Sequence, residues 1–446
     1  MALFLVLCTA VLPGGHARQA TSVSASGTEN ANDPTWLLPY LYPTTRALEL
    51  SRDPAARYVF AGTGYGHGVG MSQWGARGRA LEGQDARTIL TSYYTGAVTG
   101  TVPAGADRML VRLLHDAMPG QGDRVHVVAG SVSLAGVAET LTSGGYLVFR
   151  PGADGYHITA ISAAGVHLAD MPVTGGLRLT GSIDSLLRVE FKPASAVTGT
   201  PGATYNVYRG SLAILPSPQG LDVINDIPLE QYLYSVVPSE MPAAWPVEAL
   251  RAQAIASRTY AIHEQRGPAA TWDLDDTTAS QVYLGALREQ ITTTQAVQST
   301  AGLVLLSDEK PIRAFYHACD AGYTEDGDAV FPDLAATYLR GFHDVNSGGA
   351  AYDRDCPRNT WKVAGVSTSD IEQALGTETR SRIGAIRWID FSSRSASGRI
   401  VQVVVGGSLG IDALPGQTFR RLFNQNHSRT AEQLLSTGFE LTRESP

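Results

Sequence analysis

Residues 221–267 constrain the fold more than any other part of the chain. Pro228 suits the first turn of a helix, and apolar residues at helical spacing follow it. The proline-rich run "VPSEMPAAWP" then predicts a loop. Pro246 opens a second, alanine-rich helix that extends to about Glu264 and is closed by Gly267. The stretch therefore predicts two helices joined by a loop.

Residues 107–219 have a different pattern. Short apolar runs such as "RMLVRLL", "RVHVVAG" and "LLRVEF" are separated by Gly, Pro, Asp and Ser. Closely spaced runs of this kind are typical of β-strands. Helices and strands in separate regions indicate the α+β fold class.

The N-terminus and the overall charge bound where such a chain works. Residues 1–20 combine an apolar run with small residues, which predicts an export signal, and the polar residues 21–57 predict a linker. The net charge of −8, without a run of Lys or Arg, argues against nucleic acid as a partner. No later segment reaches about 18 uninterrupted apolar residues, so we expect no transmembrane helix.

Glu240 is the first candidate for chemistry. Pro238 and Pro242 flank it, and Met241 and Trp245 are expected to form apolar walls around its carboxyl group. Such surroundings raise a carboxyl pKa and keep the proton that a general acid needs. The alternative is a surface glutamate in a turn.

The second helix carries polar side chains among its alanines. Arg258 shares a face with apolar residues and needs a partner there, because an unpaired buried charge is costly. Gln253 and Tyr260 are further polar groups on the same helix. Alternatively, Arg258 extends to the surface along its own methylene groups.

The segment "GYGHGVGMSQWGA" places five glycines around His67. It has no dinucleotide-binding register and no following Gly-Lys-Ser/Thr, so phosphate binding is not expected. Glycines in this number allow positive φ angles or a close approach to a ligand. A glycine-rich structural turn is the alternative.

Two cysteines remain once an export signal is removed. Cys319 and Cys356 would most simply form one disulfide in an exported protein. A zinc site that includes His317 and a pair of free thiols are the alternatives.

Five motifs together resemble the SpoIID/LytB family. They are "GYGHGVGMSQWGA", "LEQYLYSVVPSEMPAAWPVEALRAQAIASRTYA", "SQVYLG", "AGYTED" and "SGRIVQVVVGG". The resemblance implies a SpoIID-like mixed core with short helices over residues 58–97 and 206–442. The β-rich module, residues 105–205, lies outside it.

The order of these motifs departs from the family. The Gly-His-Gly motif usually follows the Glu-Met-Pro core, whereas here it precedes that core. We interpret this order as a circular permutation, which close termini tolerate. It predicts that residues 58–96 pack on the Glu240 core after the C-terminal strand. A further departure is Asp320-Ala321 before Gly322, where the family often has small Ser and Gly residues.

The resemblance implies an exported lytic transglycosylase that cleaves peptidoglycan glycan strands and leaves 1,6-anhydro-muramic ends. Glu240 would be the general acid/base and Arg258 would anchor a sugar or steady Glu240, with no cofactor or metal. The expected substrate-binding residues are His67, Ser72, Gln73, Gln253, Tyr260, Gln281, Tyr283, His317 and Thr324. In this reading the motif glycines let the backbone approach a sugar chain.

Other functions remain open. The LytB branch implies a non-catalytic glycan binder that enhances a cell-wall amidase. A structural wall protein that binds through its β-rich module is a third reading, and a zinc enzyme a fourth. All of them place the protein outside the cell or in the cell wall.

Overall fold

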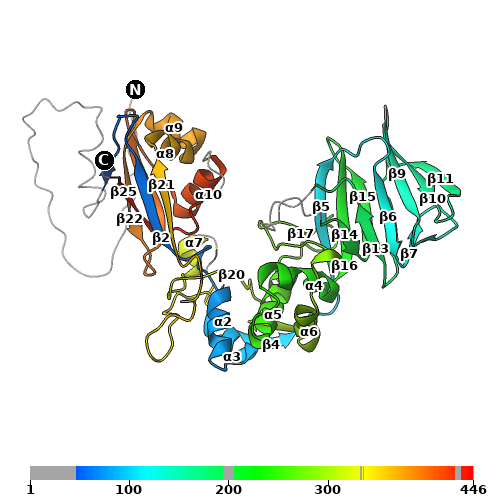
Figure 1. The fold of residues 1–446 in the computed structure, drawn as a ribbon, viewed down its shortest axis with the longest axis horizontal. Coiled ribbons are helices and arrows are strands. Elements are labelled where there is room, and N and C mark those ends of the chain that lie inside the picture. Colours follow the sequence, from blue (N-terminus) through cyan, green and yellow to red (C-terminus); the bar gives the residue numbers. More distant parts are fainter. Residues whose placement is uncertain (1–46, 194–204, 332–333, 335, 427–432, 445–446) are drawn as a thin grey trace, which may run out of the picture.

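The computed structural model describes residues 47–193, 205–331, 334, 336–426 and 433–444. The expected signal, residues 1–20, and most of the linker lie outside these residues. The described chain forms a row of three parts, with a β-module at one end, helices in the middle and a mixed lobe at the other end (Figure 1). Helices and strands in several sheets confirm the α+β class. No helix in the described part is long and apolar enough to cross a membrane.

The β-module consists of two sheets, which confirms the strand-rich character predicted for this region. One sheet has the order β11 (His167–Pro172), β10 (Gly155–Ile161), β9 (Tyr146–Gly152), β6 (Arg124–Ala129), β13 (Leu186–Val189) and β14 (Val207–Arg209). The other has the order β17 (Leu274–Asp275), β5 (Arg108–Ala117), β16 (Leu221–Pro228), β15 (Ser211–Pro216), β12 (Leu177–Gly181), β7 (Ser131–Leu134) and β8 (Leu141–Thr142). The module's sheets therefore include β14 to β16, which follow residue 205.

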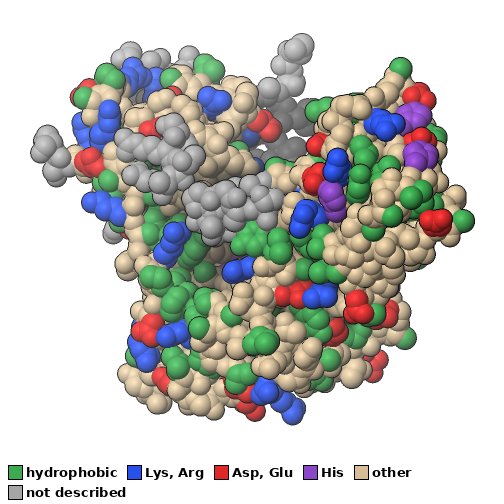
Figure 2. Space-filling model, turned by 45° about the vertical axis from the view of Figure 1, so that its right-hand side comes forward, with side chains coloured by type: hydrophobic (Ala, Val, Ile, Leu, Met, Phe, Trp, Pro, Cys, Tyr) green, Lys and Arg blue, Asp and Glu red, His purple; other side chains and the backbone are tan. Residues whose placement is uncertain are grey.

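Histidine side chains gather on the lobe that the β-module forms (Figure 2). Each hydrogen-bonds a carboxylate; the pairs are His115–Asp222, His126–Glu190, His157–Asp154 and His167–Asp170. Because these histidines lie on the β-module and Glu240 does not, they are not candidates for acid or base catalysis beside Glu240.

The middle part is a group of helices around α5. Its helices are α2 (Gln73–Leu81), α3 (Ala86–Tyr93), α4 (Leu229–Glu240), α5 (Val247–His263), η3 (Ala286–Arg288) and α6 (Ile291–Ser299). Short ladders join them, namely β4 (Val98–Thr101) with β18 (Leu303–Ser307) and β19 (Lys310–Pro311), and β3 (Met71–Ser72) with β20 (Tyr316–His317). The two helices predicted in residues 221–267 are confirmed as α4 and α5. Asp85 caps α3 by accepting from the Thr88 amide at 2.7 Å.

The predicted loop around Glu240 begins too early. Pro238 removes one intrahelical hydrogen bond, but α4 continues to Glu240, and the Met241 amide donates to the Val237 carbonyl. Glu240 is therefore the last residue of a helix rather than the middle of a loop.

The mixed lobe has two antiparallel sheets. One has the order β1 (Leu48–Glu49), β22 (Ile386–Arg394), β23 (Ile400–Gly407) and β24 (Ile411–Pro415); the other has the order β21 (Thr360–Val366), β2 (Tyr58–Thr63) and β25 (Phe439–Arg443). The remaining helices are α7 (Gly327–Val330), α8 (Thr368–Ala374), α9 (Gly376–Ile383) and α10 (Gly416–Asn426). Buried aromatic rings around Phe60 fill the core.

The strand before the glycine motif pairs with the last strand of the chain. Tyr58 in β2 lies opposite Arg443 in β25, and the ladder continues for five residue pairs. The chain then passes from β2 into β3 and α2; α2 packs on α5, the helix that packs on α4 and its terminal Glu240. The circular permutation itself stays a prediction.

Candidate active site

Glu240 lies in a cavity of about 470 Å³ that is lined by Tyr260 of α5, by Phe331 and by four further segments. The segments are the glycine motif with α2, the end of α4, residues 278–282, and β20 with its flanks. The lining residues are Tyr65, Gly66, His67, Gln73, Glu240, Tyr260, Thr278, Ala279, Ser280, Val282, Phe315, Tyr316, His317, Ala318 and Phe331. Glu240 is the only carboxylate among these described lining residues.

Three groups hold the Glu240 carboxyl group. Gln73 Nε2 donates to Oε2 at 3.3 Å, and the Val282 amide donates to Oε1 at 3.3 Å. The Tyr316 hydroxyl forms a further hydrogen bond to the carboxyl group. Burial raises the pKa of Glu240, and these hydrogen bonds partly oppose the rise. A carboxyl group in this state retains a proton at higher pH than an exposed glutamate, as a general acid requires.

Tyr316 and Val282 are contacts that the sequence did not predict. Tyr316 receives a hydrogen bond from Gln281 Nε2 at 3.0 Å, and Gln281 Oε1 accepts from the buried Tyr232 hydroxyl at 3.1 Å. The parallel pairing of β20 with β3 sets Tyr316 opposite Met71, two residues before Gln73. Tyr316 is the neighbour of the predicted residue His317 in the sequence. Its position beside Glu240 follows from the pairing of β20 with β3 and not from the sequence alone.

A second hollow, of about 500 Å³, also has Glu240 in its described lining. The rest of that lining comes from the end of α4, from residues 241–243, and from Arg288 and Gln290. Glu240 therefore belongs to the lining of both hollows.

The aromatic rings that wall the Glu240 cavity include the expected Tyr260 and two rings that the sequence did not predict, Phe315 and Phe331. Phe315 and Phe331 stack with their centroids 4.6 Å apart, and Tyr260 lies 5.9 Å from Phe315. The expected wall residue Trp245 instead packs edge to face on Trp74, at 4.8 Å. It lines a separate hollow against α6, so its expected position beside Glu240 is wrong.

His67 and His317 both line the cavity as neutral rings. His67 Nδ1 accepts from the Val69 amide at 3.0 Å, and burial with the nearby Arg420 and Arg399 lowers its pKa to about 3. His317 Nδ1 lies 3.2 Å from the Val69 carbonyl, and burial holds its pKa well below the usual range. These rings can form hydrogen bonds but carry no charge near neutral pH.

Most of the space left by the motif glycines is filled by protein, not left for a ligand. Gly68 and Gly70 have φ angles of +85° and +71°. A Cβ atom at Gly68 would lie 2.6 Å from the Arg399 guanidinium carbon, and one at Gly70 would lie 2.1 Å from the Phe315 carbonyl oxygen. These glycines let the motif pack on neighbouring segments; Gly66 alone of them lines the cavity.

Arg258 does not line the Glu240 cavity. It is completely buried, and its Nε and Nη2 donate to the Glu230 carboxylate at 2.8 and 2.7 Å. Nη1 donates to the Leu303 carbonyl at 3.1 Å, which ties α5 to β18. The expected contact with sugar or with Glu240 is therefore replaced by a bond between structural elements.

The other predicted site residues fall into two groups, those that line the Glu240 cavity and those that do not. Gln73, Tyr260, His67 and His317 line the cavity. Gln281 lies behind it, holding Tyr316. Four residues serve internal bonds away from the lining: Ser72 caps α2, Gln253 donates to Ser257, Tyr283 donates to Asn225, and Thr324 accepts from the Phe342 amide.

Cys319 and Cys356 form a disulfide, with Cα atoms 6.6 Å apart. This selects one of the three alternatives for these cysteines, because bonded sulfurs cannot also be zinc ligands. Ala321 follows with a φ of +63°, a conformation that glycine adopts more easily. In the described chain, three potential metal ligands converge only at His115, Asp116 and Asp222, on the β-module.

Comparison with known proteins finds similarity to the family that the five motifs resemble. A family profile described as SpoIID, Stage II sporulation protein, matches residues 217–306. Stage II sporulation protein D of Bacillus subtilis is 29% identical over 245 residues, covering 50% of this chain and 65% of that protein. The B. subtilis amidase enhancer is 42% identical over 99 residues, 22% of this chain and 13% of that protein. An uncharacterized protein of Brachyspira hyodysenteriae is 36% identical over 136 residues, 30% of this chain and 37% of that protein. The chain spans less than two thirds of each of these relatives.

Proposed function

We propose that the chain, whose motifs and matches resemble the SpoIID/LytB family, is an exported lytic transglycosylase of the bacterial cell wall. The observation that carries the proposal is a single carboxylate with a raised pKa in a cavity whose described lining has no second one. Hydrolysis of a glycosidic bond normally uses two carboxylates. One suffices when the sugar's own C6 hydroxyl replaces water.

The proposed reaction has two steps at Glu240. The protonated carboxyl group gives its proton to the glycosidic oxygen, the bond from C1 to that oxygen breaks, and the leaving sugar departs as an alcohol. The Glu240 carboxylate then takes the proton of the C6 hydroxyl while that oxygen bonds to C1. A 1,6-anhydro ring results, and Glu240 is protonated again.

The neighbours of Glu240 support both states of the carboxyl group. Gln73 and the Val282 amide donate hydrogen bonds that stabilise the carboxylate after proton transfer. Burial favours the protonated form before it. The aromatic wall and the two hollows beside Glu240 suit a polymer that is cut within its length.

The test uses glycan strands stripped of stem peptides. The wild-type protein is expected to release 1,6-anhydro-muramic ends detectable by mass spectrometry, and Glu240→Gln is expected to release none. The control must exchange Glu and Gln without disturbing the fold, which rules out Gln253→Glu because Gln253 is completely buried. The exposed Glu378→Gln serves instead, with unchanged activity expected.

A second candidate function rests on one comparison. The B. subtilis relative described as an amidase enhancer matches this chain over 99 residues. A non-catalytic glycan binder that stimulates a wall amidase would release no anhydro ends. It would also retain its stimulation in the Glu240→Gln variant.

A further inference from the structure

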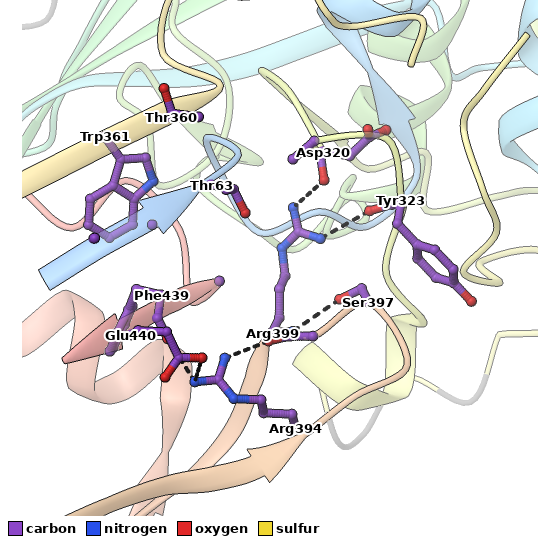
Figure 3. A pocket seen from close by; sticks show the side chains of 15 residues that line it. Thr63, Asp320, Tyr323, Thr360, Trp361, Arg394, Ser397, Arg399, Phe439 and Glu440 are labelled. Carbon is purple, nitrogen blue, oxygen red and sulfur yellow. Dashed lines mark hydrogen bonds and ion pairs between the residues drawn. The ribbon is translucent and has the colours of Figure 1, made fainter. Parts of the chain in front are cut away.

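A further cavity, of about 490 Å³ and with charged and aromatic side chains in its lining, lies beside the Glu240 cavity. Its described lining joins β2, β21 and β25 to the loop before β23 and to residues 320–323. Figure 3 shows the side chains of Thr63, Trp361, Arg394, Ser397 and Arg399 around it. The family resemblance assigned no role to this cavity, which we call the Arg394 cavity.

The two cavities share the segments that separate them. In one segment, Thr63 lines the Arg394 cavity and Tyr65 lines the Glu240 cavity. In the other segment, Asp320 lines the Arg394 cavity and Ala318 lines the Glu240 cavity. Reciprocal hydrogen bonds between the Tyr65 and Cys319 backbones join the two segments. Two residues of chain span at most about 7 Å, so the linings of the two cavities are within that distance at Thr63 and Tyr65.

Arg399 places a buried positive charge in the wall, and the carboxyl groups of Asp320, Glu325 and Asp353 lie close enough to interact with it. It is 3% exposed, and its Nη1 and Nη2 donate to the carbonyls of Tyr323 and Asp320 at 3.1 and 3.3 Å. Its Nε has no hydrogen-bond partner in the described chain. Because its hydrogen bonds go to carbonyls and Nε is unused, Arg399 also adds positive charge beside an anion bound in the cavity.

Arg394 is the guanidinium that a ligand can reach. Its Nη1 and Nη2 are oriented by the carbonyls of Gly398 and Phe439, at 2.7 and 2.8 Å. Nη2 also lies 2.9 Å from Oε1 of Glu440, whose side chain is 74% exposed. Exposed pairs of this kind contribute little, so an incoming carboxylate can replace Glu440.

Trp361 supplies a fixed apolar surface beside these charges. Its Nε1 donates to the Gly64 carbonyl at 3.0 Å, and Gly62 lies against the indole, where a Cβ would come within 2.2 Å of the ring. The half-buried ring thus lines the cavity in one orientation, together with the hydroxyl groups of Thr63 and Ser397.

We propose that the Arg394 cavity binds a sugar unit that carries a carboxylate, one or two units along the glycan from the bond held at Glu240. The inference rests on the proposed function for its ligand class, a wall glycan in which muramic acid bears a lactyl carboxylate. The carboxylate pairs with Arg394 in the field of Arg399, and the sugar ring lies on Trp361. The cavity then selects acidic over neutral strands and sets the register of cleavage.

Binding is measured in the full chain carrying Glu240→Gln, so that no ligand is cut. The probes are a tetrasaccharide of alternating N-acetylglucosamine and N-acetylmuramic acid, and a neutral tetrasaccharide of N-acetylglucosamine, titrated by calorimetry. Adding Arg394→Gln is expected to weaken binding of the acidic probe about tenfold, the effect of losing one charge-assisted bond, and to leave the neutral probe unchanged. Arg394→Lys should retain part of the preference.

The matched control is Arg382→Gln, which removes an ion-paired arginine of the same lobe, bonded to Asp412 at 2.6 Å. Equal binding of the acidic probe by the Arg394 and Arg382 variants would overturn the proposal. So would an equal loss for both probes in the Arg394 variant, since that indicates general damage. An Arg394-dependent preference without anhydro ends from the wild type would defeat only the catalytic proposal. Anhydro ends without that preference would defeat only the proposal for this cavity.

Discussion

Tyr316→Phe removes one hydroxyl group from the surroundings of Glu240 while keeping the ring. In the native protein this hydroxyl hydrogen-bonds Glu240 and lowers its pKa against the larger effect of burial. It also accepts from Gln281, which retains its bond to the Ser257 carbonyl at 3.3 Å. The main consequence is therefore a change in the acidity of Glu240.

The size of the change follows from the bond that is lost. A hydrogen bond to a charged group contributes about 1.5–3 kcal/mol, and one pKa unit corresponds to about 1.4 kcal/mol. The bonds from Gln73 and Val282 remain, so we take the lower end. The pKa of Glu240 is expected to rise by about one unit on this scale.

The assay is the pH dependence of kcat/KM for release of anhydro-muramic ends. The first step needs protonated Glu240, so activity falls as pH rises through its pKa. The high-pH limb of the profile should therefore move upward by about one unit in Tyr316→Phe. Tyr94→Phe is the control: it removes a buried hydroxyl that donates to the Phe315 carbonyl at 2.8 Å and should leave the limb in place.

An unchanged high-pH limb in Tyr316→Phe would refute this reasoning. It would mean either that Glu240 is not the titrating acid or that the Tyr316 bond does not stabilise its carboxylate. An equal movement in both variants would point to a general effect of lost stability.

Three further predictions concern stability. Arg258→Lys should lower the free energy of unfolding by about 3 kcal/mol, because lysine cannot keep both bonds to Glu230. The folded variant should keep its kcat. A normal urea midpoint together with a lost kcat would show instead that Arg258 has a catalytic role. Gly70→Ala should destabilise by about 1–3 kcal/mol more than Gly96→Ala, since both have positive φ but only Gly70 abuts a carbonyl; equal thermal midpoints would contradict the packing argument. Replacing Cys319 and Cys356 by serine removes a disulfide between residues that are 37 positions apart in the sequence. The free energy of unfolding, measured in urea, should fall by about 4 kcal/mol, and a fall of less than about 1 kcal/mol would contradict the stabilising contribution of the disulfide.

The sequence predicted the helices and the site residues best where their positions depend on neighbouring residues in the chain. Proline and glycine signals located α4 and α5 to within a few residues. Glu240 was identified from its neighbours, although the prolines suggested a loop where the helix continues. His67 and Gln73 lie in its cavity.

Other features depend on contacts between distant segments. Arg258 needed a partner, but nothing local indicates that Glu230, 28 residues earlier, supplies it. Tyr316 reaches Glu240 only because β20 pairs with β3. The motif glycines suggested a sugar, because the sequence does not reveal that Arg399 and Phe315 fill the space beside them.

The most direct test of a single-carboxylate mechanism is cleavage in water enriched in oxygen-18. If Glu240 directs the C6 hydroxyl to C1, the new muramic ends are anhydro rings and contain no oxygen-18. Mass spectrometry of the products from peptide-free strands should then show unlabelled anhydro ends only, and none from Glu240→Gln. Reducing ends that carry oxygen-18 would show that water attacks C1, and would contradict the account.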